Sequence, residues 1–241
     1  MRSGNPVLKS DVFVGQRSYD ASGVMTTQGV VNKTFILLFL AVFSATWTWA
    51  NPQKFLPFIG IAAIGGFLIG LVTVFKKEWV TVTAPVYALL EGFILGGISS
   101  IFEKQFPGIV IQAVGLTFGV LFSLLFAYSA RMIKVTNNFR TGVIIATGGI
   151  VFLYFISFLM GLFGVRIPFI HESGTLGIGF SIFVVIIASL NLILDFDFIE
   201  QGSQSGAPKY MEWYGAFGLM VTLIWLYFEI LRLLGKMRNN R

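Results

Sequence analysis

Residues 175–199 read TLGIGFSIFVVIIASLNLILDFDFI, and the first 20 of them, up to Leu194, carry no charged side chain. About 20 consecutive apolar residues are what an α-helix needs to cross the hydrocarbon core of a bilayer. The stretch therefore predicts a transmembrane helix. Two aspartates, Asp195 and Asp197, follow at the point where the uncharged run ends.

Six further apolar runs of similar length lie on either side of this one, and most of the connections between them are short. Short connections indicate that neighbouring helices are antiparallel within one bundle. The sequence thus predicts an all-α, polytopic integral membrane protein with seven transmembrane helices, over residues 35–50, 55–75, 79–101, 108–130, 141–164, 175–199 and 214–234. We divide the chain into an N-terminal cytoplasmic tail (1–30), a seven-helix transmembrane domain (31–236) and a basic C-terminal tail (237–241).

The composition of the 241-residue chain supports this fold class, since 56% of its residues are apolar and 12% are charged. Charged residues make up about a quarter of a soluble domain, so the composition excludes a soluble enzyme, a disordered chain and a nucleic-acid-binding module. The net charge of +6 comes from short basic clusters between the apolar runs, which are typical of membrane-flanking charge. The chain has no cysteine, which excludes disulfides and thiolate metal sites.

Glycine spacing predicts close contact between some of these helices. Small residues four apart form a flat stripe that lets helix backbones approach closely in lipid. Such stripes occur in the second, third and fourth predicted helices, as the pairs Gly66 and Gly70, Gly92 and Gly96, and Gly115 and Gly119.

The basic residues in the connecting loops predict the orientation. With the N-terminus in the cytoplasm, six Lys and Arg residues lie in inner loops and three in outer loops, and basic residues favour the cytoplasmic side. The inner loops then contain Lys76 and Lys134, and the outer loops contain Lys54, Glu103 and His171.

Three acidic residues lie within the apolar runs, where an ionisable group is costly and indicates function by default. At about 1.5 Å per residue, Asp195 is about 6 Å from the cytoplasmic end of its helix, Glu91 about 18 Å and Glu229 about 22 Å. Carboxylates at three depths are typical of a pathway for a cation or a proton. Asn191 shares a helix face with Asp195, whereas Asp197 points elsewhere, and we expect it to meet lipid headgroups or water.

Simpler interpretations of these acids stay open. Glu229 can form an ion pair with Arg232, three residues later, and Asp195 can simply mark the end of its helix. Glu91 has no basic residue within reach on its own helix. It is therefore either protonated and donating a hydrogen bond, or ionised in a wet cavity where a cation replaces the missing base; we slightly favour the second interpretation.

Nothing in the sequence indicates catalysis. His171 is the only histidine, so a histidine metal cluster and a Ser-His protease site are both missing. There is no glycine-rich phosphate loop. We expect no enzymatic activity and no cofactor.

The ends of the last two helices carry a family resemblance. Residues 194–200 read LDFDFIE, residues 206–214 read GAPKYMEWY, and residues 226–234 read LYFEILRLL. Together these segments resemble the Bax inhibitor-1 superfamily, particularly its bacterial YccA-like branch, over about residues 30–236. The resemblance implies six helices around a central seventh. It also implies an acidic pair between helices six and seven that acts as a pH-sensitive latch on a calcium leak, with Asp195 and Glu229 in the matching positions.

The resemblance implies a pH-sensitive Ca²⁺ or general cation leak channel in a bacterial inner membrane, with Asp195 and Glu229 as its Ca²⁺ ligands. Glu91 is a further candidate for the ion path, and Asn191, Asp197 and Arg232 are supporting residues. The alternative is a membrane-embedded regulator that binds a membrane protease through its N-terminal tail; proteins resembling YccA are linked to inhibition of an AAA membrane protease. The expected partners are the lipid bilayer and, in this alternative, that protease, and no nucleic acid; the sequence leaves the oligomeric state open.

Overall fold

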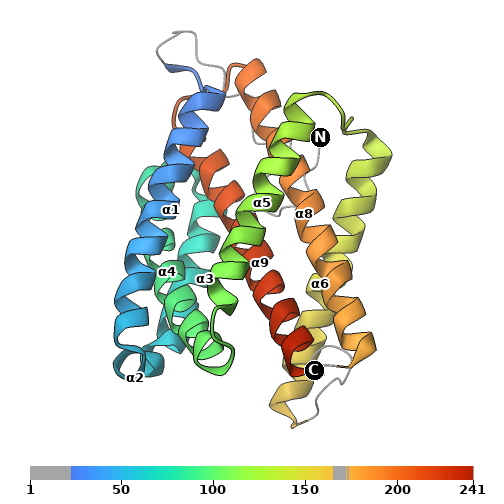
Figure 1. The fold of residues 1–241 in the computed structure, drawn as a ribbon. Coiled ribbons are helices and arrows are strands. Elements are labelled where there is room, and N and C mark those ends of the chain that lie inside the picture. The colour runs from blue at the N-terminus through green and yellow to red at the C-terminus, as the bar shows by residue number, and fades with distance from the viewer. Residues whose placement is uncertain (1–22, 165–171, 173, 241) are drawn as a thin grey trace. The chain divides into compact units, whose positions relative to one another are not determined.

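The computed structural model describes residues 23–164, 172 and 174–240. Within them, seven helical spans are long and apolar enough to cross a membrane, which confirms the predicted all-α polytopic architecture. An isolated antiparallel bridge joins Val24 to Pro208. The elements are α1 (Thr27–Ala50), α2 (Pro52–Phe55), η3 (Leu56–Phe58), α3 (Ile59–Phe75), η4 (Lys77–Trp79), α4 (Val80–Gln105), α5 (Ile109–Ser129), α6 (Asn137–Leu162), α8 (Thr175–Gln204) and α9 (Met211–Asn239) (Figure 1).

Two helix ends differ from the predicted domain boundaries. α1 begins at Thr27 because the hydroxyl of Thr26 accepts a hydrogen bond from the Gly29 N–H at 3.0 Å and caps the helix. Residues 27–30 are therefore helical. α9 continues to Asn239, so most of the predicted C-terminal tail is helical as well. Residues 1–22, which make up most of the predicted N-terminal tail, and His171 lie outside the described residues.

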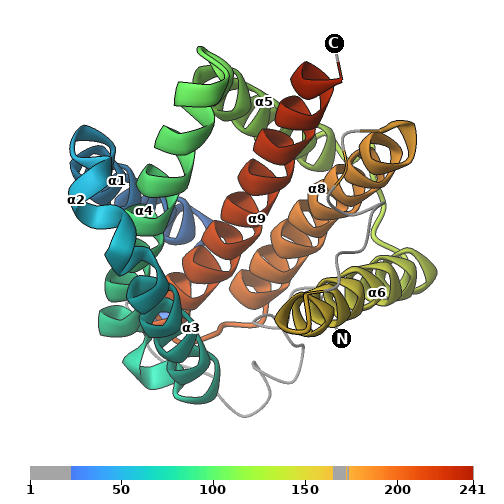
Figure 2. The same ribbon diagram turned by 90° about the horizontal axis from the view of Figure 1, so that it is seen from below.

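The chain divides into two compact units. In the described residues, unit 1 contains α5, α6, α8 up to Asp197 and α9 from Thr222, together with their connections. Unit 2 contains α1 to α4, the end of α8 and the start of α9. Within unit 1, α8 has α9 on one side and α6 on the other when seen from below (Figure 2).

Unit 2 is built around α4, which packs against both α1 and α3. A side-chain carbon added to Gly92 or Gly96 would overlap the backbone of Ala41 or Ala45 on α1. The Ser44 hydroxyl also donates to the carbonyl oxygen of Leu89 at 2.7 Å. The glycine stripe predicted on this helix is therefore a backbone contact. By contrast, a carbon added to the corresponding glycines of α5 meets no atom within 4 Å in the described part of the chain.

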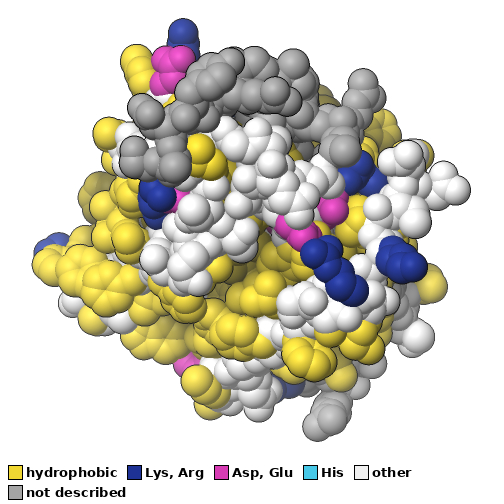
Figure 3. Space-filling model, turned by 90° about the horizontal axis from the view of Figure 1, so that it is seen from above, with side chains coloured by type: hydrophobic (Ala, Val, Ile, Leu, Met, Phe, Trp, Pro, Cys, Tyr) yellow, Lys and Arg dark blue, Asp and Glu magenta, His cyan; other side chains and the backbone are white. Residues whose placement is uncertain are grey.

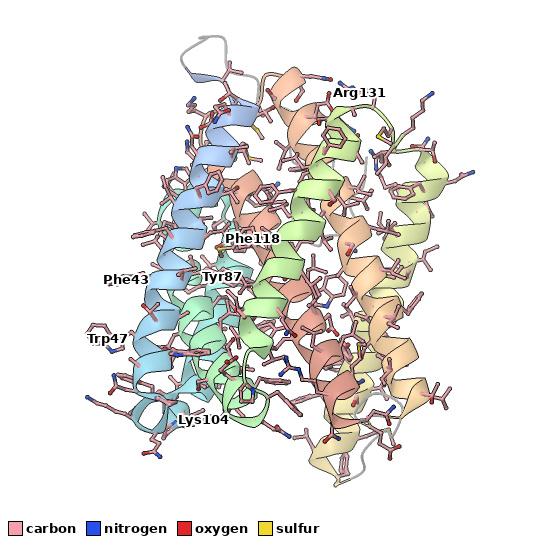
Figure 4. The ribbon with its side chains drawn as sticks, viewed as in Figure 1. Phe43, Trp47, Tyr87, Lys104, Phe118 and Arg131 are labelled. Carbon is pink, nitrogen blue, oxygen red and sulfur yellow. The ribbon has the colours of Figure 1, made fainter. Side chains whose placement is uncertain are left out.

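The spans differ in how much of their surface is buried. α9 is buried over 61% of its most apolar window, whereas the other six spans range from 17% to 44%. Large apolar side chains are exposed on the other helices, as Figure 3 shows on one face, and Phe43 and Trp47 project outward from α1 in Figure 4.

Candidate functional site

A row of polar side chains follows one face of α6 in unit 1. Arg140, Thr147 and Tyr154 are seven residues apart, a spacing that places them on the same helix face. Each contacts a polar side chain of α8 or α9. We call this set the polar track; it extends over about 21 Å of α6 and consists of Arg140, Thr147, Tyr154, Asn191, Asp195, Asp197, Glu229 and Arg232.

One end of the polar track is an ion pair. The Nη2 atom of Arg140 donates to Oδ2 of Asp197 at 2.5 Å, and the two side chains are only 12% and 16% exposed. Arg140 lies in the first turn of α6, which Thr136 caps by accepting a hydrogen bond from the Phe139 N–H. Asp197 was expected to meet headgroups or water. It binds α6 instead, because the flexible Arg140 side chain reaches across to it.

The middle of the polar track combines an amide with a carboxylate. The Nδ2 atom of Asn191 donates to the Thr147 hydroxyl at 2.8 Å and to the carbonyl oxygen of Ile187 at 2.9 Å. Its Oδ1 accepts no hydrogen bond from the described residues. Asp195 follows one turn later and is fully buried. A buried amide oxygen without a donor, such as Oδ1 of Asn191, is costly to retain, so this level of the track is a candidate site for an ion or water.

The third level is a compact cluster around Glu229. The Tyr154 hydroxyl donates to the two carboxylate oxygens of Glu229, at 3.0 and 3.1 Å. The Nη1 atom of Arg232 lies 2.7 Å from that hydroxyl and 3.2 Å from the carboxylate. The predicted pair of Glu229 with Arg232 is therefore present. Sequence reasoning missed Tyr154, although its spacing from Arg140 and Thr147 was visible in the sequence.

Asp195 and Glu229 lie at different levels of the track. Nζ of Lys236 donates to the carbonyl oxygen of Gly177 and to the Ser181 hydroxyl, at 3.0 and 2.9 Å, which fixes the antiparallel register of α8 and α9. Glu229 is seven residues before Lys236 and thus lies beside residue 186 of α8. Asp195 is nine residues further along, about 14 Å away at 1.5 Å per residue. The two acids therefore have separate surroundings.

Glu91 belongs to unit 2, on α4. The Tyr87 hydroxyl, one turn earlier on the same helix, lies beside its carboxylate. Both side chains face glycines of α3: an added carbon on Gly66 would lie 3.3 Å from Oε1 of Glu91, and one on Gly70 would lie 3.4 Å from the Tyr87 ring. Figure 4 shows Tyr87 among the helices of this unit. The glycine stripe of α3 thus makes room for a polar pair.

Residues 23–164, 172 and 174–240 contain no group of three or more His, Cys, Asp or Glu side chains that could hold a metal ion. The available chemistry is that of single carboxylates, amides and hydroxyls at successive levels of a membrane span. Such groups bind and release protons, or exchange ligands with a passing cation.

Comparison with known proteins gives one result. A family model described as Bax inhibitor 1 like matches residues 5–239, which include all seven spans. No curated protein matches the chain.

Proposed function

The chain belongs to the Bax inhibitor 1 like family of multi-pass membrane proteins, and on that premise we propose that it is a pH-sensitive cation leak channel. Ca²⁺ is the proposed ion, and the bacterial inner membrane, with the N-terminus in the cytoplasm, is the proposed location. The observation that supports this best is the polar track. Charged and polar side chains inside a membrane span mark ion pathways, because lipid alone gives no reason to keep them there.

Asp195 is the group that we propose meets the ion. Carboxylate, amide and hydroxyl oxygens are the ligands that Ca²⁺ prefers, and Asp195, Asn191 and Thr147 supply one of each. Glu229 is a weaker candidate, since the guanidinium of Arg232 already balances its charge. We therefore assign Glu229 and Arg232 to the wall of the pathway.

The test is Ca²⁺ flux into liposomes that contain the purified protein, measured from about pH 6 to about pH 8. The proposal predicts flux above that of empty liposomes and a clear change in rate across this range. Asp195→Asn should lower the rate at least tenfold, because it removes the charge and keeps the shape. Flux equal to that of empty liposomes at every pH would refute the channel.

Single cysteines test the orientation, since the chain has none of its own. Asn138→Cys, exposed at the start of α6, should resist a membrane-impermeant thiol reagent in intact cells. Gln53→Cys, exposed on α2, should react. The reverse pattern would place the N-terminus outside.

A second candidate function is regulation of a membrane protease through the N-terminal tail. The observation that favours it is a pair of backbone hydrogen bonds that join the segment before α1 to the α8–α9 connection. The Met25 N–H donates to the Ala207 carbonyl oxygen and the Lys209 N–H to that of Gly23, both at 2.7 Å. The tail therefore starts from a fixed point beside the α8–α9 connection. Deleting residues 2–22 keeps these bonds; a regulator would lose protease binding, whereas a channel would keep its flux.

A further inference from the structure

Several acidic side chains within the spans have a basic partner. Asp197 pairs with Arg140 and Glu229 with Arg232. Glu212, at the start of α9, contacts the ammonium groups of Lys33 and Lys209. A carboxylate beside a cation keeps its charge in apolar surroundings. Each of these three acids therefore faces a cationic side chain.

Glu91 has different surroundings, which can be followed element by element. α3, which faces it with Gly66, has no titratable residue over Ile59–Phe75. α1 has one charged residue, Lys33, and its ammonium is bound to Glu212. On α4 itself the other charged residues, Glu103 and Lys104, are at least 12 positions away, or about 18 Å.

The charged residues on two other neighbours of α4 lie near helix ends. α2 and η4 carry Lys54, Lys77 and Glu78 near helix ends; Lys77 is 14 positions before Glu91, or about 21 Å. From α9, Phe217 packs against the Tyr87 ring, with centroids 4.9 Å apart. In the described part of unit 2, Tyr87 is thus the titratable group that reaches Glu91.

These surroundings suit a proton better than a metal ion. Ca²⁺ takes six to eight oxygen ligands, and this place offers one carboxyl group and one phenol beside a glycine face. A protonated carboxyl is neutral and can donate a hydrogen bond to the Tyr87 hydroxyl. An ionised carboxylate without a cation must draw in water, because its burial without a partner is costly.

We propose that Glu91 and Tyr87 form a proton-binding site in unit 2, and that this site is the pH sensor of the leak. The second part rests on the proposed channel function, while the first does not. Loss of the proton hydrates the contact between α3 and α4, where the carboxyl faces Gly66. Binding of the proton closes that contact again.

Infrared difference spectroscopy between acidic and alkaline buffer tests the proton site without any flux assay. The wild-type protein should show a pH-dependent carboxylic acid carbonyl band that disappears in Glu91→Gln. The matched control, Glu78→Gln, changes an exposed glutamate of η4 and should leave the band in place. A pH-dependent band that is unchanged in Glu91→Gln would overturn the proposal, as would its absence from the wild type.

Tyr87→Phe gives a second test that keeps the ring and its contact with Phe217. Loss of the hydroxyl should shift the carbonyl band and move its pH midpoint, and an unshifted band would overturn the pairing. In the flux assay, Glu91→Gln should conduct at a rate that no longer depends on pH, and a pH profile like that of the wild type would overturn the sensor role. A wild-type band without Ca²⁺ flux would support the proton site and refute the channel.

Discussion

Glu212→Ala should lower the free energy of unfolding by about 3 kcal/mol, because it removes a fully buried carboxylate that accepts from three other residues. Glu212 is fully buried in the first turn of α9. Its Oε1 accepts from the backbone N–H and the hydroxyl of Thr26, at 3.0 and 2.9 Å. Nζ of Lys33 lies 2.5 Å from Oε2, and Nζ of Lys209 lies 2.9 Å from Oε1.

The matched control is Lys209→Ala. The Lys209 side chain is 50% exposed, so water replaces its part of the interaction and the expected loss is below about 1 kcal/mol. Thermal unfolding in detergent, followed by circular dichroism, compares the two variants with the wild type. Equal midpoints for the two variants would show that the Glu212 contacts contribute no more than a surface ion pair.

The number and approximate positions of the spans could be predicted from the sequence, because hydropathy alone decides whether a helix crosses a bilayer. The helix ends were less predictable. α1 starts eight residues before the predicted segment at Phe35, since the Thr26 cap is polar and leaves no trace in hydropathy. α9 continues past Leu234 because the ammonium of Lys236 donates a hydrogen bond to the Ser181 hydroxyl, while the backbone of Lys236 remains helical.

The side-chain partners across helices could be predicted only in part. The Glu229–Arg232 pair is local, three residues apart, and was foreseen. Two partners of Glu212, Lys33 and Thr26, lie 179 and 186 residues away in the sequence, and Arg140 is 57 residues from Asp197. Such pairs depend on how each helix is rotated about its axis. Because these helices are apolar on most sides, the sequence does not show which face of each helix points inward.

The separation of Asp195 from Glu229 along the helices was easier to estimate than their partners. Counting residues placed Asp195 and Glu229 about 16 Å apart along the membrane normal, and the register set by Lys236 gives about 14 Å. The resemblance to Bax inhibitor-1 proteins implied a latch between these two acids. Helix geometry, which follows directly from residue number, puts them at separate levels.

Thr147→Cys tests whether ions pass along the polar track, because Thr147 lies at its middle and is only 7% exposed. A positively charged, membrane-impermeant thiol reagent can reach this position only through a water-filled pathway. The wild type, without cysteine, should be insensitive to the reagent. The matched control is Ile145→Cys on the same helix, 69% exposed on the outer surface, where lipid excludes a charged reagent.

The deciding measurement is therefore Ca²⁺ flux through liposomes containing Thr147→Cys, before and after this reagent is added. The account predicts that flux falls close to the level of empty liposomes in Thr147→Cys and stays unchanged in Ile145→Cys. Undiminished flux in Thr147→Cys, or an equal loss in both variants, would contradict conduction along the polar track.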